Sequence, residues 1–185
     1  MGIRQRMRRA VFLDRDGVIN RALVRESRPY PPSHLGEVEI LAGVPEALKA
    51  LHEAGFLLIV VTNQPDAARG ITPRGTIEGI NNYLASHLII DEFLTCFHDD
   101  VDDCVCRKPK PGALLAAAQK HHIDLGSSYM IGDRWKDIEA GRRAGCKTIF
   151  VDHKYAEEQP ESFDHCVRSL HEASEIILGK AYEKN

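Results

Sequence analysis

The sequence predicts an α/β fold, a doubly wound parallel sheet with helices on both faces. Four short runs rich in apolar residues have the length of buried strands, and apolar residues at helical spacing lie between them. Strands that alternate with helices are typical of a parallel sheet with right-handed crossovers. The predicted strands span 10–13, 56–61, 128–131 and 147–151.

The other segments complete this alternation. Residues 20–39 carry three prolines and few periodic apolar residues, which indicates a long ordered loop. Residues 93–111 have no clear period and indicate a loop organised by a metal ion. No sizeable insertion follows the first or the second strand, so we expect no large cap domain. A short edge strand is predicted at 164–167, and helices are predicted at 41–55, 72–87, 112–121, 137–145 and 169–178.

Composition limits the classes of function. The 185 residues, 43% of them hydrophobic, fit one globular domain over 1–185. The 24 basic and 27 acidic residues give a net charge of −3, which argues against a general nucleic-acid binder. We find no apolar stretch long enough to cross a membrane and no signal peptide, so we expect a cytoplasmic protein. Without an evident exposed apolar stripe, we expect a monomer.

Polar side chains follow three of the predicted strands, at the point where each strand ends. Asp14 and Asp16 follow the first strand, Thr62 and Asn63 the second, and Asp133 with Asp137 the third. Carboxylates that converge at one sheet edge repel each other unless a cation lies among them, and oxygen ligands suit Mg²⁺. The sequence therefore predicts a magnesium site at this edge.

The basic pair Arg107 and Lys108, in a run of prolines and lysines, supplies positive charge from a fourth direction. A phosphoryl group under transfer needs such charge on its equatorial oxygens. Together with the carboxylates, this pair favours phosphoryl transfer. The less specific interpretations are a helix cap for Thr62 and a surface lysine for Lys108.

Three cysteines and a histidine crowd into residues 96–106. Three thiolates and one imidazole satisfy tetrahedral Zn²⁺ without an open position, which indicates a structural site. We expect Zn²⁺ to fix the loop at about 93–111 and thereby to position Lys108. The alternatives are free cysteines in an acidic loop, or a neighbouring aspartate in place of the histidine. The predicted ligands are Cys96, His98, Cys104 and Cys106.

The chain resembles the haloacid dehalogenase superfamily of phosphatases, which use an aspartate nucleophile. Within it, the chain is similar to the D-glycero-D-manno-heptose 1,7-bisphosphate 7-phosphatases of the histidinol-phosphatase group. The matching motifs occur in the family's order and cover most of the chain. They are Phe-Leu-Asp-Arg-Asp-Gly-Val-Ile-Asn at 12–20, Val-Thr-Asn-Gln at 61–64 with Ala-Arg-Gly at 68–70, Cys-Arg-Lys-Pro-Lys-Pro-Gly at 106–112 and Met-Ile-Gly-Asp-Arg at 130–134.

The resemblance implies roles for the residues of these motifs. Asp14 attacks the phosphorus, and Asp16 protonates the leaving oxygen and later takes a proton from water. The Asp14 carboxylate, the Asp16 backbone carbonyl and Asp133 hold Mg²⁺, while Asp137 lies behind them or stabilises Lys108. Thr62 and Lys108 contact the phosphoryl oxygens. The residues expected to bind the rest of a phosphorylated sugar are Asn63, Gln64, Arg107 and Arg21.

The sequence departs from the family pattern in the loop above the substrate. Residues 99–103 form a short and strongly acidic segment, so the preferred sugar or anomer is open. An acidic rim suits an amine, which keeps histidinol phosphate as the alternative substrate. A nucleic-acid 3′-phosphatase, or a zinc-binding interaction module without catalysis, fits less well because the aspartates are present and the charge is acidic. Arg21, Arg25 and Arg28 either hold a second phosphate or form a solvated loop.

Overall fold

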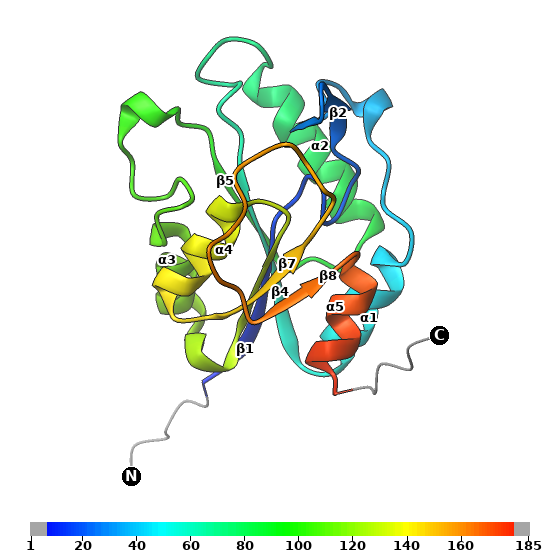
Figure 1. Ribbon diagram of the computed structural model, residues 1–185, viewed down its shortest axis with the longest axis vertical. Helices are drawn as coiled ribbons and strands as arrows, with labels where there is room; N and C mark the ends of the chain where they lie inside the picture. Colours follow the sequence, from blue (N-terminus) through cyan, green and yellow to red (C-terminus); the bar gives the residue numbers. More distant parts are fainter. Residues whose placement is uncertain (1–6, 180–185) are drawn as a thin grey trace.

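The computed structural model describes residues 7–179 and contains a six-stranded, wholly parallel sheet with helices on both faces (Figure 1). The strand order is β5-β4-β1-β6-β7-β8. The predicted fold class is therefore confirmed. The strands are β1 (Arg9–Leu13), β4 (Phe56–Asn63), β5 (Glu92–Cys96), β6 (Tyr129–Gly132), β7 (Lys147–Val151) and β8 (His165–Val167).

Five α-helices and three short 3-10 helices connect the strands in the described part of the chain. The α-helices are α1 (Val44–Glu53), α2 (Arg74–His87), α3 (Gly112–His121), α4 (Trp135–Ala144) and α5 (Leu170–Ile177). The short helices are η1 (Leu35–Glu37), η2 (Asp100–Asp102) and η3 (Leu125–Ser127). The helix predicted at 72–87 is α2, which begins two residues later than predicted. The helix predicted at 137–145 is α4, which begins two residues earlier. The second shift arises because Asp137 accepts a hydrogen bond from the Arg134 backbone and closes the first turn of α4.

Two apolar cores lie on opposite faces of the sheet, because alternate residues of a strand point to opposite faces. In β1, Val11 and Leu13 belong to one core, and Ala10 and Phe12 belong to the other. The first core is covered by apolar residues of α1, α2 and α5, and the second by those of α3 and the end of α4. A central strand that is buried on both faces explains why its sequence is a continuous apolar run.

The chain reverses its direction of winding at β1. From β1 it passes through α1 to the neighbouring β4 and on to β5, then returns to β6 on the other side of β1 and continues to β7. The crevice outside the carboxyl ends of the strands at such a switch point is where open α/β sheets bind ligands. Asp14 directly follows β1 at this point.

Two segments that lack an apolar period nevertheless form strands. The predicted loop at 93–111 begins inside β5, an edge strand whose side chains are mostly half-buried and whose pairing with β4 comes from the backbone. The predicted loop at 20–39 contains an antiparallel hairpin of β2 (Leu23–Arg25) and β3 (Arg28–Tyr30). Hairpins this short and exposed leave little hydrophobic pattern to detect.

Within residues 7–179, the segments after β1 and β4 contain only this hairpin, short helices and turns, so no large cap lies over the sheet edge. A search of the same residues finds no helix that is both long and apolar enough to cross a membrane.

Candidate active site

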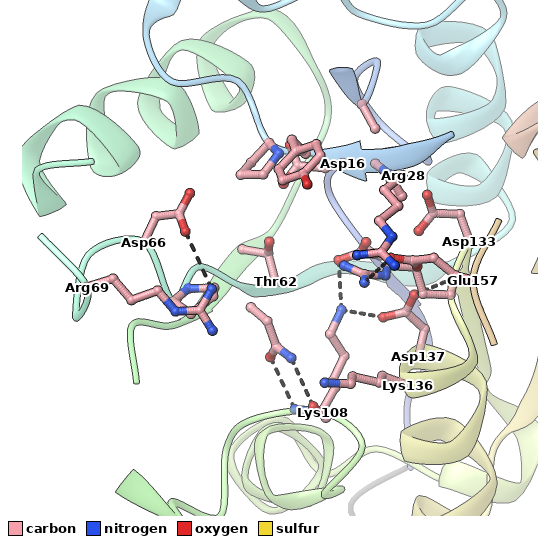
Figure 2. Close-up of a pocket in the computed structure, with 18 residues that line it drawn as sticks. Asp16, Arg28, Thr62, Asp66, Arg69, Lys108, Asp133, Lys136, Asp137 and Glu157 are labelled. Carbon is pink, nitrogen blue, oxygen red and sulfur yellow. Dashed lines mark hydrogen bonds and ion pairs between the residues drawn. The ribbon is translucent and has the colours of Figure 1, made fainter. Parts of the chain in front are cut away.

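A cleft of about 290 Å³ opens at the carboxyl ends of β1, β4 and β6 (Figure 2). Three sheet strands, the hairpin, α4 and the loop before α3 contribute side chains to it. All the residues predicted for catalysis and magnesium binding meet here, together with Asn63, predicted to bind substrate, and Asp137. They are Asp14, Asp16, Thr62, Asn63, Lys108, Asp133 and Asp137.

Lys108 lies at the centre of the charged groups and is almost fully buried. Its ammonium group donates hydrogen bonds to Asp14 Oδ1 at 2.7 Å and to the Val61 carbonyl at 2.7 Å. It also forms an ion pair with Asp137 Oδ1 at 2.6 Å. These three partners use all three donors of the ammonium group and fix it beside Asp14.

Burial and the packing of like charges shift the pKa values in this cluster. Burial and the neighbouring Asp137 raise the pKa of Asp14 to about 6, although Lys108 opposes the shift. Burial opposes the charged form of Lys108, but Asp137 and Asp14 outweigh it and raise the lysine pKa above its usual value. Burial, with Asp14 and Asp137 nearby, raises the pKa of Asp133 well above its usual value. One lysine does not balance three buried carboxylates.

Asp133 is buried, and neither of its carboxylate oxygens has a hydrogen-bond partner. The backbone of the turn after β1 approaches it closely, because a Cβ on Gly17 would lie 1.9 Å from Asp133 Oδ2. Gly17 also has a φ of 89°, in the left-handed region that favours glycine. A buried carboxylate without a hydrogen-bond partner is costly, so its position favours the binding of a cation there.

Ligand oxygens of Asp14, Asp133 and Asp137 lie within 4.8 Å of one another. Both oxygens of Asp137 are already engaged, one with Lys108 and the other with the Arg134 backbone N–H. Asp14 and Asp133 are therefore the carboxylates available to a metal, and their hard oxygens fit Mg²⁺. The geometry favours Asp137 as the partner that orients Lys108.

Asp16 lines the cleft and is held by three neighbours. Arg15, whose side chain is completely buried, donates from Nε and Nη2 to the two carboxylate oxygens at 3.2 and 3.1 Å. Asn20 donates to Asp16 Oδ1 at 2.9 Å, and Gln64 donates to Asp16 Oδ2 at 2.8 Å. Gly17 allows the tight turn that places Asp16 apart from Asp14.

Thr62 and Asn63 lie at the end of β4. The Thr62 hydroxyl lies at the cleft and accepts a hydrogen bond from Gln64 Nε2 at 2.8 Å. The Asn63 side chain donates to the Lys108 carbonyl and accepts from the Lys108 N–H, at 2.9 and 3.1 Å. Asn63 therefore fixes the backbone of Lys108, and both residues line the cleft.

Three residues expected to bind substrate lie elsewhere. Gln64 is buried behind Thr62 and Asp16 and does not line the cleft. Arg21 is exposed and pairs with Glu39 at 3.0 Å, outside the cleft. Arg107 donates to Asp100 at 2.7 Å and to the His98 carbonyl at 3.3 Å, within the cysteine-rich loop.

A second set of ligands gathers next to the cleft. Cys96 ends β5, and His98, Cys104 and Cys106 follow in the loop that leads to Lys108. Five of their Sγ and Nδ1 separations fall between 3.3 and 3.6 Å. A tetrahedral zinc, with bonds of about 2.3 Å to sulfur and about 2.0 Å to nitrogen, requires separations of about 3.8 and about 3.6 Å. The four ligands could therefore hold a structural zinc.

Several site residues were not identified from the sequence. The cleft is also lined by Arg69, Lys136 and Glu157, and Arg15 and Asn20 hold Asp16 from behind. Arg28 lines the cleft too, and the sequence leaves it open, with Arg21 and Arg25, as a ligand of a second phosphate. The only sequence signal for Arg15 is a charge at the end of a buried run. The others lie in loops, on the exposed hairpin or on the first turn of α4, where composition carries no sign of the cleft.

Comparisons with known proteins agree with this site. A family model described as HAD-hydrolase-like matches residues 105–173. The D-glycero-β-D-manno-heptose-1,7-bisphosphate 7-phosphatase of Helicobacter pylori J99 is 34% identical, over 85% of this chain and 91% of that protein. The protein of the same name from Escherichia coli K12 is 36% identical, over 75% of this chain and 76% of that protein.

Among solved structures, the D,D-heptose 1,7-bisphosphate phosphatase of B. bronchiseptica, complexed with magnesium and phosphate, superposes with a TM-score of 0.79. It is 28% identical, and the match covers 94% of this chain and 99% of that one. The cleft at the switch point and these relatives lead to one conclusion. The chain belongs to the haloacid-dehalogenase-like phosphatases, in the family of the heptose-1,7-bisphosphate 7-phosphatases.

Proposed function

We propose that the protein is a Mg²⁺-dependent phosphatase that removes the C7 phosphate of D-glycero-D-manno-heptose 1,7-bisphosphate. The observation that carries the proposal is the buried cluster of Asp14, Lys108 and the unpartnered Asp133 at the switch point. Relatives at 34 and 36% identity carry this activity in their names.

In the first step, an oxygen of the Asp14 carboxylate attacks the phosphorus. A bond forms between this oxygen and phosphorus, and the bond between phosphorus and the C7 oxygen of the sugar breaks. Asp16 supplies a proton to that oxygen. Lys108, which lies 2.7 Å from Asp14, offsets the charge on the phosphoryl oxygens, and the Thr62 hydroxyl donates to one of them.

In the second step, water attacks the phosphorus of the aspartyl-phosphate. Asp16 takes a proton from the water, the bond from Asp14 to phosphorus breaks, and inorganic phosphate leaves. Arg15, Asn20 and Gln64 orient Asp16 through its two carboxylate oxygens. The pair Asp137 and Lys108 keeps the lysine beside Asp14 in both steps.

The groups that would hold Mg²⁺ are the carboxylates of Asp14 and Asp133 and the backbone carbonyl of Asp16. When bound, Mg²⁺ supplies positive charge beside the transferring phosphoryl group. It also relieves the uncompensated burial of Asp133.

We further propose that Cys96, His98, Cys104 and Cys106 bind Zn²⁺. The loop after β5 has only a short 3-10 helix and bends, so the metal would replace missing secondary structure. Cys106 lies two residues before Lys108, and Asn63 fixes the Lys108 backbone from the other side.

The acidic loop gives little support to histidinol phosphate as substrate. Asp99 is paired with Arg69, Asp100 with Arg107, and Asp103 with Lys110. Since three of the four aspartates of this rim are paired with cations, the rim attracts a substrate amine only weakly. The cytoplasmic location and the monomeric state predicted from the sequence stay predictions.

The first test is phosphate release by the purified protein with Mg²⁺ on both anomers of heptose 1,7-bisphosphate, fructose 1,6-bisphosphate and histidinol phosphate. We expect one heptose anomer to exceed the other substrates in kcat/KM by about 100-fold or more, since specificity arises from differential transition-state binding. Asp14→Asn should abolish turnover because an amide is a poor nucleophile. Higher kcat/KM for histidinol phosphate would refute the substrate assignment, and full activity of Asp14→Asn would refute the mechanism.

Lys108→Met removes the only ammonium group that contacts the buried carboxylates within residues 7–179. We expect kcat to fall about 100- to 1000-fold because the charge on the phosphoryl oxygens is no longer offset. Without Mg²⁺, the free energy of unfolding should fall by about 3–5 kcal/mol, since Asp14 and Asp137 stay buried without their cationic partner. Lys110→Met, at an exposed lysine of the same loop, is the matched control and should change stability by less than about 0.5 kcal/mol. Equal effects of the two variants would contradict this account.

The zinc proposal predicts about one zinc per chain in metal analysis of the purified protein. Cys106→Ser should lower the zinc content, the unfolding temperature and kcat together, because the loop that carries Lys108 loses a ligand. Cys166→Ser, at an exposed cysteine outside the cluster, should leave all three unchanged. A zinc-free protein with full activity would exclude a structural zinc.

A further inference from the structure

A sugar bisphosphate carries a second phosphate that is not hydrolysed, and the enzyme must hold it some distance from Asp14. We propose that Arg28 and Lys136 form the subsite for this phosphate, which in heptose 1,7-bisphosphate is the one on C1. The inference rests on the proposed function and extends it to the residues that select a bisphosphate.

Most cations around the cleft already have carboxylate partners. Lys108 is shared by Asp14 and Asp137. Arg134 pairs with Glu157 at 2.7 Å. Arg69 makes a two-pronged contact with Asp99, at 2.6 and 2.7 Å.

The acidic loop removes another candidate. Arg107, the arginine next to Lys108 in sequence, is directed toward Asp100 and does not line the cleft. Its side chain is mostly buried in that contact, with 11% exposed. The acidic segment at 99–103 thus neutralises two arginines, Arg69 and Arg107, on its own side of the cleft.

Arg28 and Lys136 are different. Both line the cleft, and neither forms an ion pair in the part of the chain that the structure describes. Arg28 begins β3 and is exposed, and Lys136 is the second residue of α4 and is half-buried. Figure 2 shows Asp66 and Arg69 at one end of the cleft, Arg28 and Glu157 at the other, and Lys136 lower in the view, close to Lys108. Arg134 is paired with Glu157, whereas Arg28 and Lys136 form no direct contact with a carboxylate among the described residues.

The structure also separates Arg28 from the other two arginines of this region. Arg21 pairs with Glu39 outside the cleft. The Arg25 guanidinium lies 5.8 Å from the centre of the Tyr30 ring, and Arg25 does not line the cleft. Of the three, only Arg28 lines the cleft.

The chemistry of the two residues suits a phosphate monoester. A guanidinium can donate two parallel hydrogen bonds to phosphate oxygens, and an ammonium group adds a point charge. Asp14 and Lys108 are buried at the base of the cleft, whereas Arg28 is exposed at its rim. A sugar with a phosphate at each end can therefore place one at Asp14 and the other at the rim.

The test compares heptose 1,7-bisphosphate with heptose 7-phosphate, which lacks the second phosphate. The readout is the ratio of the two kcat/KM values. Arg28→Ala and Lys136→Met should each lower this ratio about tenfold, mainly through a higher KM for the bisphosphate, since each variant loses a charge-assisted hydrogen bond to the second phosphate. Arg28→Lys should restore part of the loss. Arg25→Ala, which removes the same charge from the same hairpin, should keep the wild-type ratio.

The outcomes separate the subsite from the proposed function. A wild-type enzyme that prefers the bisphosphate, together with unchanged ratios in Arg28→Ala and Lys136→Met, overturns the subsite alone. An equal loss in Arg25→Ala also overturns it, because the effect would then come from the general surface charge. A wild-type enzyme without preference for the bisphosphate overturns both the subsite and the proposed substrate. Thermal unfolding of each variant identifies losses that come from misfolding.

Discussion

The structure depends on one electrostatic constraint, the burial of three carboxylates around a single ammonium group. Asp14 follows β1, Asp133 follows β6 and Asp137 lies in the first turn of α4, so the parallel pairing of β1 with β6 brings them together. Lys108 offsets part of their charge and binds two of them, while Asp133 has no partner. A cation that joins such a cluster stabilises it, so stability, metal binding and catalysis draw on the same side chains.

The position of Lys108 in turn depends on a loop that has little regular structure. Asn63 binds the lysine backbone through both its N–H and its carbonyl, and the cysteine-rich cluster lies just before it. The acidic segment at 99–103 is tied to Arg69, Arg107 and Lys110. These contacts hold the buried ammonium group of Lys108 beside Asp14. They also pair Arg69, Arg107 and Lys110 with carboxylates, which leaves Arg28 and Lys136 to bind the second phosphate of a substrate.

The sequence was sufficient to predict the sheet and the central cluster, because both have local signals. A strand buried on both faces must be a continuous apolar run, and the aspartates follow such runs directly. It was not sufficient for β5 or for the β2–β3 hairpin, whose strands are held by backbone pairing and lack an apolar pattern. Nor did it distinguish Arg28 from Arg21 and Arg25, because the partner of an exposed arginine depends on tertiary contacts such as Glu39 and Tyr30.

The central claim is that Asp14 becomes phosphorylated during turnover. The most direct measurement is rapid acid quenching of the enzyme with heptose 1,7-bisphosphate and Mg²⁺, followed by borohydride reduction and peptide mass spectrometry. Reduction converts an aspartyl-phosphate into homoserine. The account predicts homoserine at position 14 and none at Asp16 or Asp133. Steady turnover without modification, or homoserine at another aspartate, would contradict it.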